Sequence, residues 1–527
     1  MAATESALRS LLTELFPHAA ADVVLKENLI HLGGDSIMAA ALASRLYQLW
    51  SMKFSVKSIL QLENFAGLMA YLPAQTVERE AEKEVINTRD VYRQTDGQKM
   101  VYLETFRQPN TTAYNIPVIA ELPIALSPLV VQQALQKVVK CFPAIFTHYY
   151  DLDGEFLFRY YEAETIPLIV YDNQQQAAQQ FVQPFDLSKD CLLRAAVVPF
   201  DGDVTQVMLD FSHIIADGLS IGHFIRRLKA ALYQKSFEGT AKTIFDFSRW
   251  TETAIYQAKF SDAAAFWHDC LGEKNLRPRW PGMRQASHTM GYGIQQAPID
   301  ALLAADIRQK AEQHQVTAFT LFLLGWSLLQ SEVTGAWNSC VGLVASGRTE
   351  PEYYDTFGMF VNTLLLPVNF NAETSLQEAL SGLAERTAAI LEHQHYPFAR
   401  QVGALQKGDD SPSPLDALFA FQNIDYQKIE IFGGRFRSFH QAKKMAQFGT
   451  VIQIFDLGEQ GYDIQWEYAP ERFSPKMVSG FLSHYQSIMS NIAHAESCHT
   501  LQQLLVIDVA NTSPCVDLNV AEFNFGI

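Results

Sequence analysis

The chain has 527 residues and a formal net charge of −17, which argues against nucleic acid or an anionic membrane as its main partner. Hydrophobic residues make up 48% of the chain, enough for about two to four domains with buried cores. The longest apolar run (318–329) is too short to span a bilayer and predicts a buried helix. The six cysteines are scattered without a CxxC pair, and the N-terminus lacks a signal-peptide pattern. Both features favour a cytoplasmic protein without a membrane segment or zinc site.

Residues 1–73 are predicted to form a small helical domain. The segment 5–16 places Leu8, Leu11, Leu12 and Leu15 on one helical face. A loop with "HLGGDS" follows, and then an alanine- and leucine-rich helix over 36–50. Two shorter helical segments, 55–62 and 64–72, complete the predicted bundle. Residues 74–91 are polar and highly charged, which predicts a linker.

From about residue 92 to 505 the chain mixes strand and helix patterns. Segments 204–211 and 337–346 are predicted strands, and 220–233 is a predicted helix with Ser220 as its N-cap. The mixture predicts an α+β architecture, and its length suggests two lobes of similar size.

The motif "LGGDSI" places Ser36 at the start of a predicted helix, where free N–H groups and the helix dipole favour an anion. Alone, Ser36 could be a simple helix cap. In a helical domain of this size, however, the motif resembles the peptidyl carrier domains of nonribosomal peptide synthetases. That resemblance implies 4′-phosphopantetheine esterified to Ser36. Asp35 stands where the family more often has histidine, which leaves the intended partner of the carrier open.

The second candidate site is "HIIADG", where His213 follows a predicted strand and Asp217 comes four residues later. Alone, His213 is more typical of a structural histidine. A Ser-His-Asp hydrolase does not fit, because the chain has no GxSxG motif. Metal binding by "HQH" (393–395) does not fit either, because no carboxylate or cysteine stands nearby at ligand spacing.

Seven ordered segments give "HIIADG" its context, and together they resemble the condensation domain of nonribosomal peptide synthetases. They are "AYNIPVIAEL" (113–122), "PFDLSKDCLLRAAVV" (184–198), "SHIIADGLS" (212–220), "ASGRTE" (345–350), "FGMFVNTLLLPV" (357–368), "HQHYPFARQVGAL" (393–405) and "DALFAFQN" (416–423). The resemblance implies a four-helix carrier bundle followed by two chloramphenicol-acetyltransferase-like lobes, with a tunnel between them. We expect the lobes at 92–265 and 266–510, and a tail at 511–527.

Site residues carry over by position in the motifs. The resemblance makes His213 and Gly218 catalytic, and it makes Asp217 a structural residue that pairs with Arg194. Ser346 of "ASGR" and Asn362 of "FVNT" match tunnel-lining positions. The implied reaction joins an acceptor amine to a donor thioester, with His213 as base or positioner and the Gly218 N–H near the developing oxyanion. No metal is implied.

Ser212 departs from the motif HHxxxDG, because it replaces the first histidine. One interpretation is a neutral substitution, because the first histidine of the motif has a structural role. The other is a terminal condensation-like domain that releases or cyclises the carrier-bound peptide, and the absence of an adenylation domain after the lobes fits this too. An inactive domain that recruits a tailoring enzyme is a further alternative. An epimerisation domain fits less well, because "DGLS" lacks that subfamily's tryptophan. The implied partners are neighbouring synthetase modules or carriers, a phosphopantetheinyl transferase, and aminoacyl or peptidyl thioesters.

Overall fold

The computed structural model describes most of the chain. Between 90 and 506 it describes all residues except 164, 200–203, 238–241, 273–290, 406–416 and 423–424. Among the first 89 residues it describes 5–16, 20, 23–29, 31, 32, 62–71 and scattered positions between 39 and 59.

The described part of the first 73 residues forms a helical unit with its own core. The helix α1 (Glu5–Leu15) buries Leu8, Leu11 and Leu12, as their spacing predicts. The final segment is a 3-10 helix, η1 (Phe65–Tyr71), and not an α-helix. Asn64 precedes this helix, and its side-chain oxygen accepts a hydrogen bond from the Gly67 N–H (3.2 Å). The predicted second helix lies partly outside the described residues.

The N-terminal lobe is built on a sheet whose described strands run in the order β12-β13-β2-β7-β6-β5. Helices α5 and α7 pack with Val118 and Ala120 of β2, whereas α6 packs with Ile119, so the sheet buries both faces. The small sheet β1-β4-β3 extends the lobe. Its elements are β1 (Tyr92–Arg93), α4 (Asp96–Arg107), β2 (Asn115–Leu122), α5 (Pro128–Val139), η2 (Pro143–Phe146), β3 (Thr147–Leu152), β4 (Glu155–Tyr160), β5 (Leu168–Val170), α6 (Gln174–Gln180), β6 (Leu193–Pro199), β7 (Thr205–Ser212), α7 (Gly218–Leu232) and α8 (Ile244–Thr251).

The C-terminal lobe is built on a second sheet, whose described strands run in the order β10-β9-β11-β14-β15-β8. The buried helix α11 covers it together with α14, as the apolar run at 318–329 predicts. Its elements are α9 (Ala254–Leu271), β8 (Gly293–Ile299), α10 (Ala301–Gln313), α11 (Ala318–Thr334), β9 (Asn338–Ala345), η3 (Pro351–Tyr353), β10 (Asn362–Asn369), α12 (Leu376–Glu392), α13 (Phe398–Leu405), β11 (Ala417–Gln422), β14 (Thr450–Asp456), η6 (Gly458–Gln460), β15 (Tyr462–Tyr468), α14 (Pro475–His494) and α15 (Leu501–Val506).

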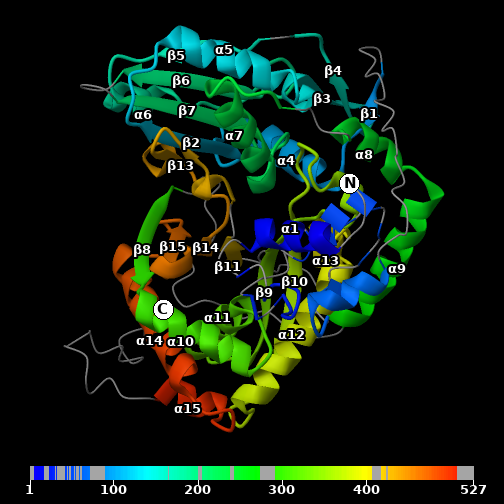
Figure 1. Ribbon diagram of the computed structural model, residues 1–527, viewed down its shortest axis with the longest axis vertical. Helices are drawn as coiled ribbons and strands as arrows, with labels where there is room; N and C mark the ends of the chain where they lie inside the picture. The colour runs from blue at the N-terminus through cyan, green and yellow to red at the C-terminus, as the bar shows by residue number, and fades with distance from the viewer. Residues whose placement is uncertain are drawn as a thin grey trace, which may run out of the picture.

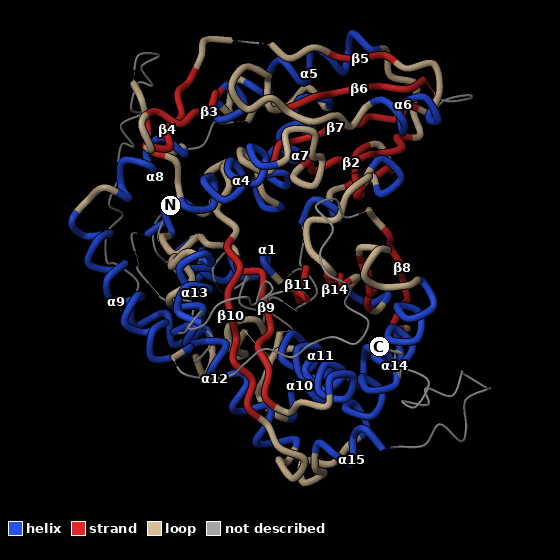
Figure 2. Tube along the Cα trace, turned by 180° about the vertical axis from the view of Figure 1, so that it is seen from behind, coloured by secondary structure: helices blue, strands red, loops and turns tan. Residues whose placement is uncertain are grey.

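The two lobes face each other across the middle of the molecule (Figure 1), and one hairpin from the second half of the chain joins the N-terminal lobe. After η4 (Asp425–Lys428), the hairpin of β12 (Glu430–Ile431) and β13 (Gly434–Ser438) joins the N-terminal sheet beside β2, and η5 (His440–Ala442) follows it. Figure 2 shows the same division from behind. The expected boundary at 265/266 falls inside α9, whose Trp267 and Leu271 pack in the C-terminal core.

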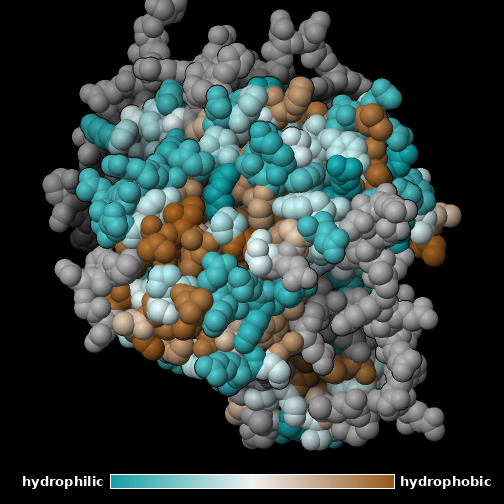
Figure 3. Space-filling view, turned by 90° about the horizontal axis from the view of Figure 1, so that it is seen from above, coloured by the Kyte–Doolittle hydropathy of each residue, from teal (hydrophilic) through white to brown (hydrophobic). Residues whose placement is uncertain are grey.

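The outer surface is consistent with the composition. The coloured part of the face seen from above is mostly hydrophilic, and its apolar side chains gather largely in one area on the left of the view (Figure 3). Within the part of the chain that the structure describes, no single helix is long and apolar enough to cross a membrane. The pair α10 and α11 passes that test only together, and the two helices are bent by 103°.

Candidate active site between the two lobes

A cavity of about 270 Å³ lies between the lobes and is lined by both. The N-terminal lobe contributes α4, β2, the residue after β7 and the start of α7. The C-terminal side contributes strands β9, β10, β11, β14 and β15, together with the segment after β13. Most of the lining is apolar, and polar side chains from both lobes make up the rest. This chemistry suits a small organic group held in a fixed orientation.

His213 lies on the wall of this cavity, directly after β7. Its backbone N–H donates to the Tyr114 carbonyl (2.8 Å). The buried Gln98 of α4 donates to the Ile214 carbonyl (3.4 Å), which holds the same loop. The Nδ1 atom of His213 is buried, which leaves Nε2 as the nitrogen that can meet a substrate.

The pKa of His213 lies below its usual 6.5. Burial is the main cause, and the charge of Lys443 acts in the same direction. Backbone hydrogen bonding and the Asp217 carboxylate favour the charged form but do not outweigh burial. His213 is therefore a neutral imidazole at pH 7, which is the form that can accept a proton.

Gly218 lines the same cavity at the start of α7. A Cβ placed on Gly218 would meet no atom within 4 Å, so the space beside this backbone is open. The first N–H groups of a helix have no intrahelical partner and carry partial positive charge. The start of α7 therefore presents hydrogen-bond donors to the cavity that His213 also faces.

Asp217 is the N-cap of α7. Its Oδ1 accepts a hydrogen bond from the Ser220 backbone N–H (2.9 Å). The prediction that Ser220 caps this helix is therefore wrong. The helix begins two residues earlier, because the Asp217 carboxylate satisfies the free N–H three positions on.

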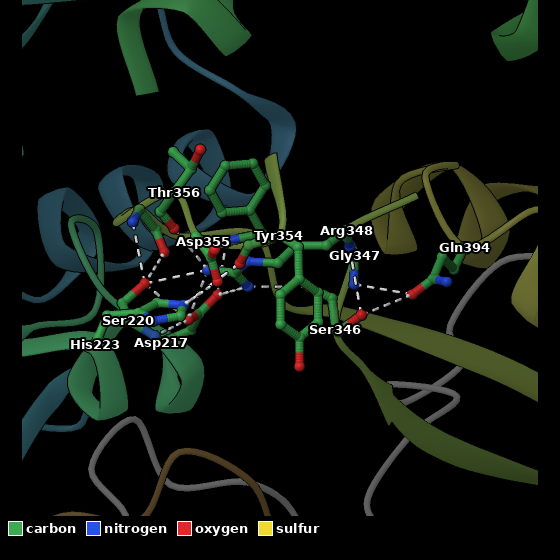
Figure 4. A network of polar contacts seen from close by, with 12 residues as sticks. Asp217, Ser220, His223, Ser346, Gly347, Arg348, Tyr354, Asp355, Thr356 and Gln394 are labelled. Atoms are coloured by element: carbon green, nitrogen blue, oxygen red, sulfur yellow. Dashed lines mark hydrogen bonds and ion pairs between the residues drawn. The ribbon is translucent and has the colours of Figure 1, made fainter. Parts of the chain in front are cut away.

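The buried partner of Asp217 is Arg348, which lies after β9 (Figure 4). Arg348 Nη1 contacts Asp217 Oδ2 at 2.6 Å and Nη2 contacts Oδ1 at 3.1 Å, and both side chains are fully buried. Although burial raises the pKa of Asp217, the charge and hydrogen bonds of Arg348 and the hydrogen bonds of Ser220 together lower it more, so the net pKa is below the usual value. The pair joins the start of α7 to the strand β9 wall of the cavity.

The predicted pairing of Asp217 with Arg194 is wrong. Arg194 stands opposite Asp210 in the antiparallel pairing of β6 and β7, and its Nη1 lies 3.5 Å from Asp210 Oδ2. By Asp217 the chain has left this sheet and turned into α7. Arg194 also donates to the carbonyls of Gln183 (2.6 Å) and Pro184 (2.8 Å), so it holds the "PFD" segment against the sheet.

Ser346 and Asn362, the two predicted tunnel residues, have different positions. Ser346 lines the cavity, and its hydroxyl donates to Gln394 Oε1 (3.5 Å). Asn362 is not among the described lining residues. Its amide donates to the carbonyls of Gln394 and Tyr396, both at 2.8 Å, so it fixes the turn of the "HQHYPF" segment.

A family model described as the condensation domain matches residues 88–510, well over half of the chain. The chain belongs to the condensation-domain family. A second model, described as the phosphopantetheine attachment site, matches residues 6–72. This order of domains confirms the resemblance to a carrier domain followed by a condensation domain, and a domain of the second family holds 4′-phosphopantetheine on a serine.

Similar curated proteins are large synthases. Bacitracin synthase 2 of Bacillus licheniformis is 26% identical over 447 residues, which is 82% of this chain and 17% of the relative. Surfactin synthase subunit 2 of Bacillus subtilis (strain 168) is 24% identical over 518 residues, which is 94% of this chain and 14% of the relative. The chain therefore spans less than a fifth of the length of these relatives.

Solved structures confirm the condensation-domain fold of two chloramphenicol-acetyltransferase-like lobes. The first condensation domain of the calcium-dependent antibiotic synthetase has a TM-score of 0.66 at 17% identity, covering 79% of this chain and 99% of that one. The X-domain from teicoplanin biosynthesis has a TM-score of 0.68 at 14% identity, covering 80% and 98%. At these identities the likeness shows the fold alone.

The remaining predicted residues are only partly placed. The motif with Asp35 and Ser36 lies outside the described residues. Ser212 is buried at the end of β7, where its N–H donates to the Leu192 carbonyl (3.0 Å). Sequence reasoning missed Arg348 as the partner of Asp217, although the quoted segment "ASGRTE" contains it. Its signal was a cationic residue close after a predicted buried strand.

Asp210 in this condensation domain should make stability depend on pH. Burial raises its pKa to about 7, although Asn115 and Arg194 act in the opposite direction. Because the folded pKa exceeds the usual 3.8, the unfolded state loses its proton first as pH rises. The contribution of protonated Asp210 to the free energy of unfolding is therefore complete below about pH 4 and is lost as pH rises through about 7.

The measurement is the urea concentration at the unfolding midpoint, at pH 5 and at pH 8. We expect this midpoint to fall less between the two pH values in Asp210→Asn than in the parent chain. Asp190→Asn is the matched control, because Asp190 also lies 3.5 Å from Arg194 but is partly exposed. An unchanged pH dependence in Asp210→Asn would contradict the assignment.

Proposed function

We propose that this chain forms amide bonds between carrier-bound groups in nonribosomal peptide synthesis. The carrier domain holds an aminoacyl or peptidyl group through Ser36, and the two lobes catalyse attack of an acceptor amine on the donor thioester. The observation that carries the proposal is that His213 and the start of α7 line one cavity between the lobes. The synthase relatives and the two family matches support it.

The residues of the cavity have separate tasks. Phosphopantetheine, when attached, supplies the thioester, which is already an activated acyl group. Neutral His213 accepts a proton from the attacking amine or holds that amine in line. As the new C–N bond forms and the C–S bond breaks, the Gly218 N–H faces the developing oxyanion, and the amine proton can pass to the departing thiolate. The apolar walls exclude the water that would hydrolyse the thioester.

Ser212 supports a second candidate, a terminal domain whose nucleophile belongs to the same peptide or to a free small amine. The Ser212 side chain is buried at the end of β7, directly before His213 in the chain, so the replacement of the motif histidine lies next to the proposed catalytic residue. The inactive, recruiting domain is the third candidate. Neighbouring modules or carriers and a phosphopantetheinyl transferase belong to the same proposal, as does a reduced cytosolic setting, which the scattered cysteines support.

The experiment loads the chain and identifies its products by mass. Incubation with a phosphopantetheinyl transferase and a peptidyl coenzyme A is expected to add one peptidyl arm, and Ser36→Ala is expected to remove this addition. An aminoacyl carrier is then supplied as acceptor, or left out. Extension of the peptide supports condensation, whereas release without an acceptor supports the terminal candidate. If no donor turns over, the inactive candidate replaces the proposal. A peptidyl arm found on Ser36→Ala would overturn the assignment of Ser36 as the attachment site.

A further inference from the structure

The C-terminal wall of the cavity carries one ion pair. Apart from His213, the ionisable groups among the described lining residues are Lys443, which follows η5, and Glu467 of β15. Lys443 Nζ lies 3.0 Å from Glu467 Oε1 and 3.3 Å from Oε2. A charged pair on an otherwise mostly apolar wall is costly to bury, so its orientation toward the cavity needs an explanation.

Glu467 is fully used by protein donors. Besides Lys443, the Gln453 amide donates to its Oε1 (3.1 Å), and the Tyr292 hydroxyl also hydrogen-bonds to it. Burial raises the pKa of Glu467, but Lys443, together with His440 and the Tyr292 hydroxyl, outweighs burial, so the pKa lies below its usual value. Glu467 is therefore an ionised anchor with little capacity left for a ligand.

Lys443 has capacity left. An ammonium group has three N–H donors. Within the described residues, the structure gives the Lys443 ammonium no hydrogen-bond acceptor other than Glu467, although the ammonium also lies over the Tyr292 ring, 5.3 Å from its centroid. Its side chain is 24% exposed, compared with 13% for Glu467. The remaining N–H groups of Lys443 are therefore available to a group inside the cavity.

The pair belongs to a polar stripe, which we define as Gln422, Gln453, Glu467 and Lys443. Gln422 of β11 donates to Gln453 Oε1 of β14 (3.1 Å), and Gln453 donates to Glu467 of β15. The stripe thus crosses three adjacent strands on one face and ends at Lys443. Each donation runs toward Glu467, so the stripe fixes the carboxylate, and the carboxylate fixes the ammonium.

We propose that Lys443 is a specificity-determining residue that donates a hydrogen bond to an amide oxygen of the acyl group in the cavity. It thereby favours peptidyl or N-acylaminoacyl groups over plain alkanoyl groups of the same length. The acceptor is a neutral oxygen, because Glu467 already balances the charge of Lys443. A second carboxylate would bring an uncompensated charge into the cavity. This inference rests on the proposed function for the identity of the bound group.

The test measures binding of two pantetheine thioether probes to the full chain carrying Ser36→Ala. One probe bears an amide in its acyl-like tail, and in the other two methylenes replace the amide. The test variant is Lys443→Met with Glu467→Gln, which removes both charges together so that no buried charge is left unpaired. A hydrogen bond to a charged donor corresponds to a preference of roughly tenfold to a hundredfold. We expect this variant to lower the ratio of the two Kd values by about tenfold or more.

Two further variants separate recognition from folding. Lys443→Arg keeps a cationic donor and should keep most of the preference. Lys444→Met removes a charge from the exposed neighbouring residue, which does not line the cavity, and should leave the ratio unchanged. An unchanged ratio in the double variant, with native circular dichroism, would overturn the proposal.

A third probe and the turnover assay separate the remaining outcomes. Tighter binding of a carboxylate-bearing probe than of the amide probe would overturn the neutral-oxygen assignment. Because binding is measured without turnover, failure of this inference is distinct from failure of the proposed function, which appears as no product from any donor. The turnover assay uses two thioester donors that differ in the same way as the first two probes, one with the amide and one with two methylenes in its place. If these donors turn over at equal rates in the parent chain, amide formation is supported and the proposed role of Lys443 is overturned.

Discussion

Asp217→Ala is expected to lower the free energy of unfolding by about 3–5 kcal/mol, because it leaves a buried guanidinium without its counter-charge. Arg348 would keep its position under the Phe360 ring (4.3 Å from guanidinium carbon to ring centroid) and lose both short contacts to a carboxylate. The backbone N–H groups of Ser220 and Phe360 would also lose their acceptor. The measurement is chemical unfolding followed by circular dichroism.

An exposed ion pair of similar length provides the control. Arg93 and Glu155 lie 2.8 Å apart with more than half of each side chain exposed. Glu155→Ala should therefore change stability by only about 0–1 kcal/mol. Arg348→Met should cost about as much as Asp217→Ala, and the double variant should cost less than the sum. If Asp217→Ala costs no more than Glu155→Ala, the pair does not secure α7.

His213→Ala is expected to reduce the single-turnover rate of amide formation by about 10²- to 10⁴-fold, which is the usual contribution of a positioned acid–base group. Loading of the carrier should not change. Because the pKa of His213 lies below 6.5, the loss of rate caused by its protonation is expected only at pH values below that. This acidic fall should be missing in His213→Ala. The measurement is the pH profile of product formed from the loaded chain.

His395→Ala is the matched control for this prediction. The His395 ring contacts the Lys259 carbonyl (3.1 Å) and does not line the cavity, so its removal should leave the rate near that of the parent. Equal rates in His213→Ala and the parent would remove His213 from the mechanism. A uniform loss at every pH, with the acidic fall retained, would contradict a proton-accepting role.

The local elements could be predicted from the sequence, because their signals are local. The predicted strand at 204–211 is β7, the predicted strand at 337–346 is β9, and the apolar run at 318–329 lies within α11. His213 and Gly218 could be placed together because they lie five positions apart, at the junction of one strand and one helix. Short-range spacing and hydrophobic periodicity carry this information.

The pairs that build the site could not be predicted in the same way. The Arg194–Asp210 pair follows from strand register, and the contact of Asp217 with Arg348 joins residues 131 positions apart. The polar stripe likewise depends on which strands are neighbours. Gln422 lies near Gln453 and Glu467 because β11, β14 and β15 are neighbours in the sheet. This order is possible because the hairpin between β11 and β14 in sequence joins the other lobe. Such contacts are set by the whole chain.

The crossing after that hairpin connects the two lobes through neighbouring residues. Ala442 is buried with Ile119 in the N-terminal lobe, whereas Lys443, the next residue, is ion-paired with Glu467 of the C-terminal sheet. Met445 then bridges to Gly291, beside β8. Adjacent residues are thus attached to opposite lobes. Separation of the lobes at this point would have to break the Lys443–Glu467 ion pair or pull Ala442 out of the N-terminal core.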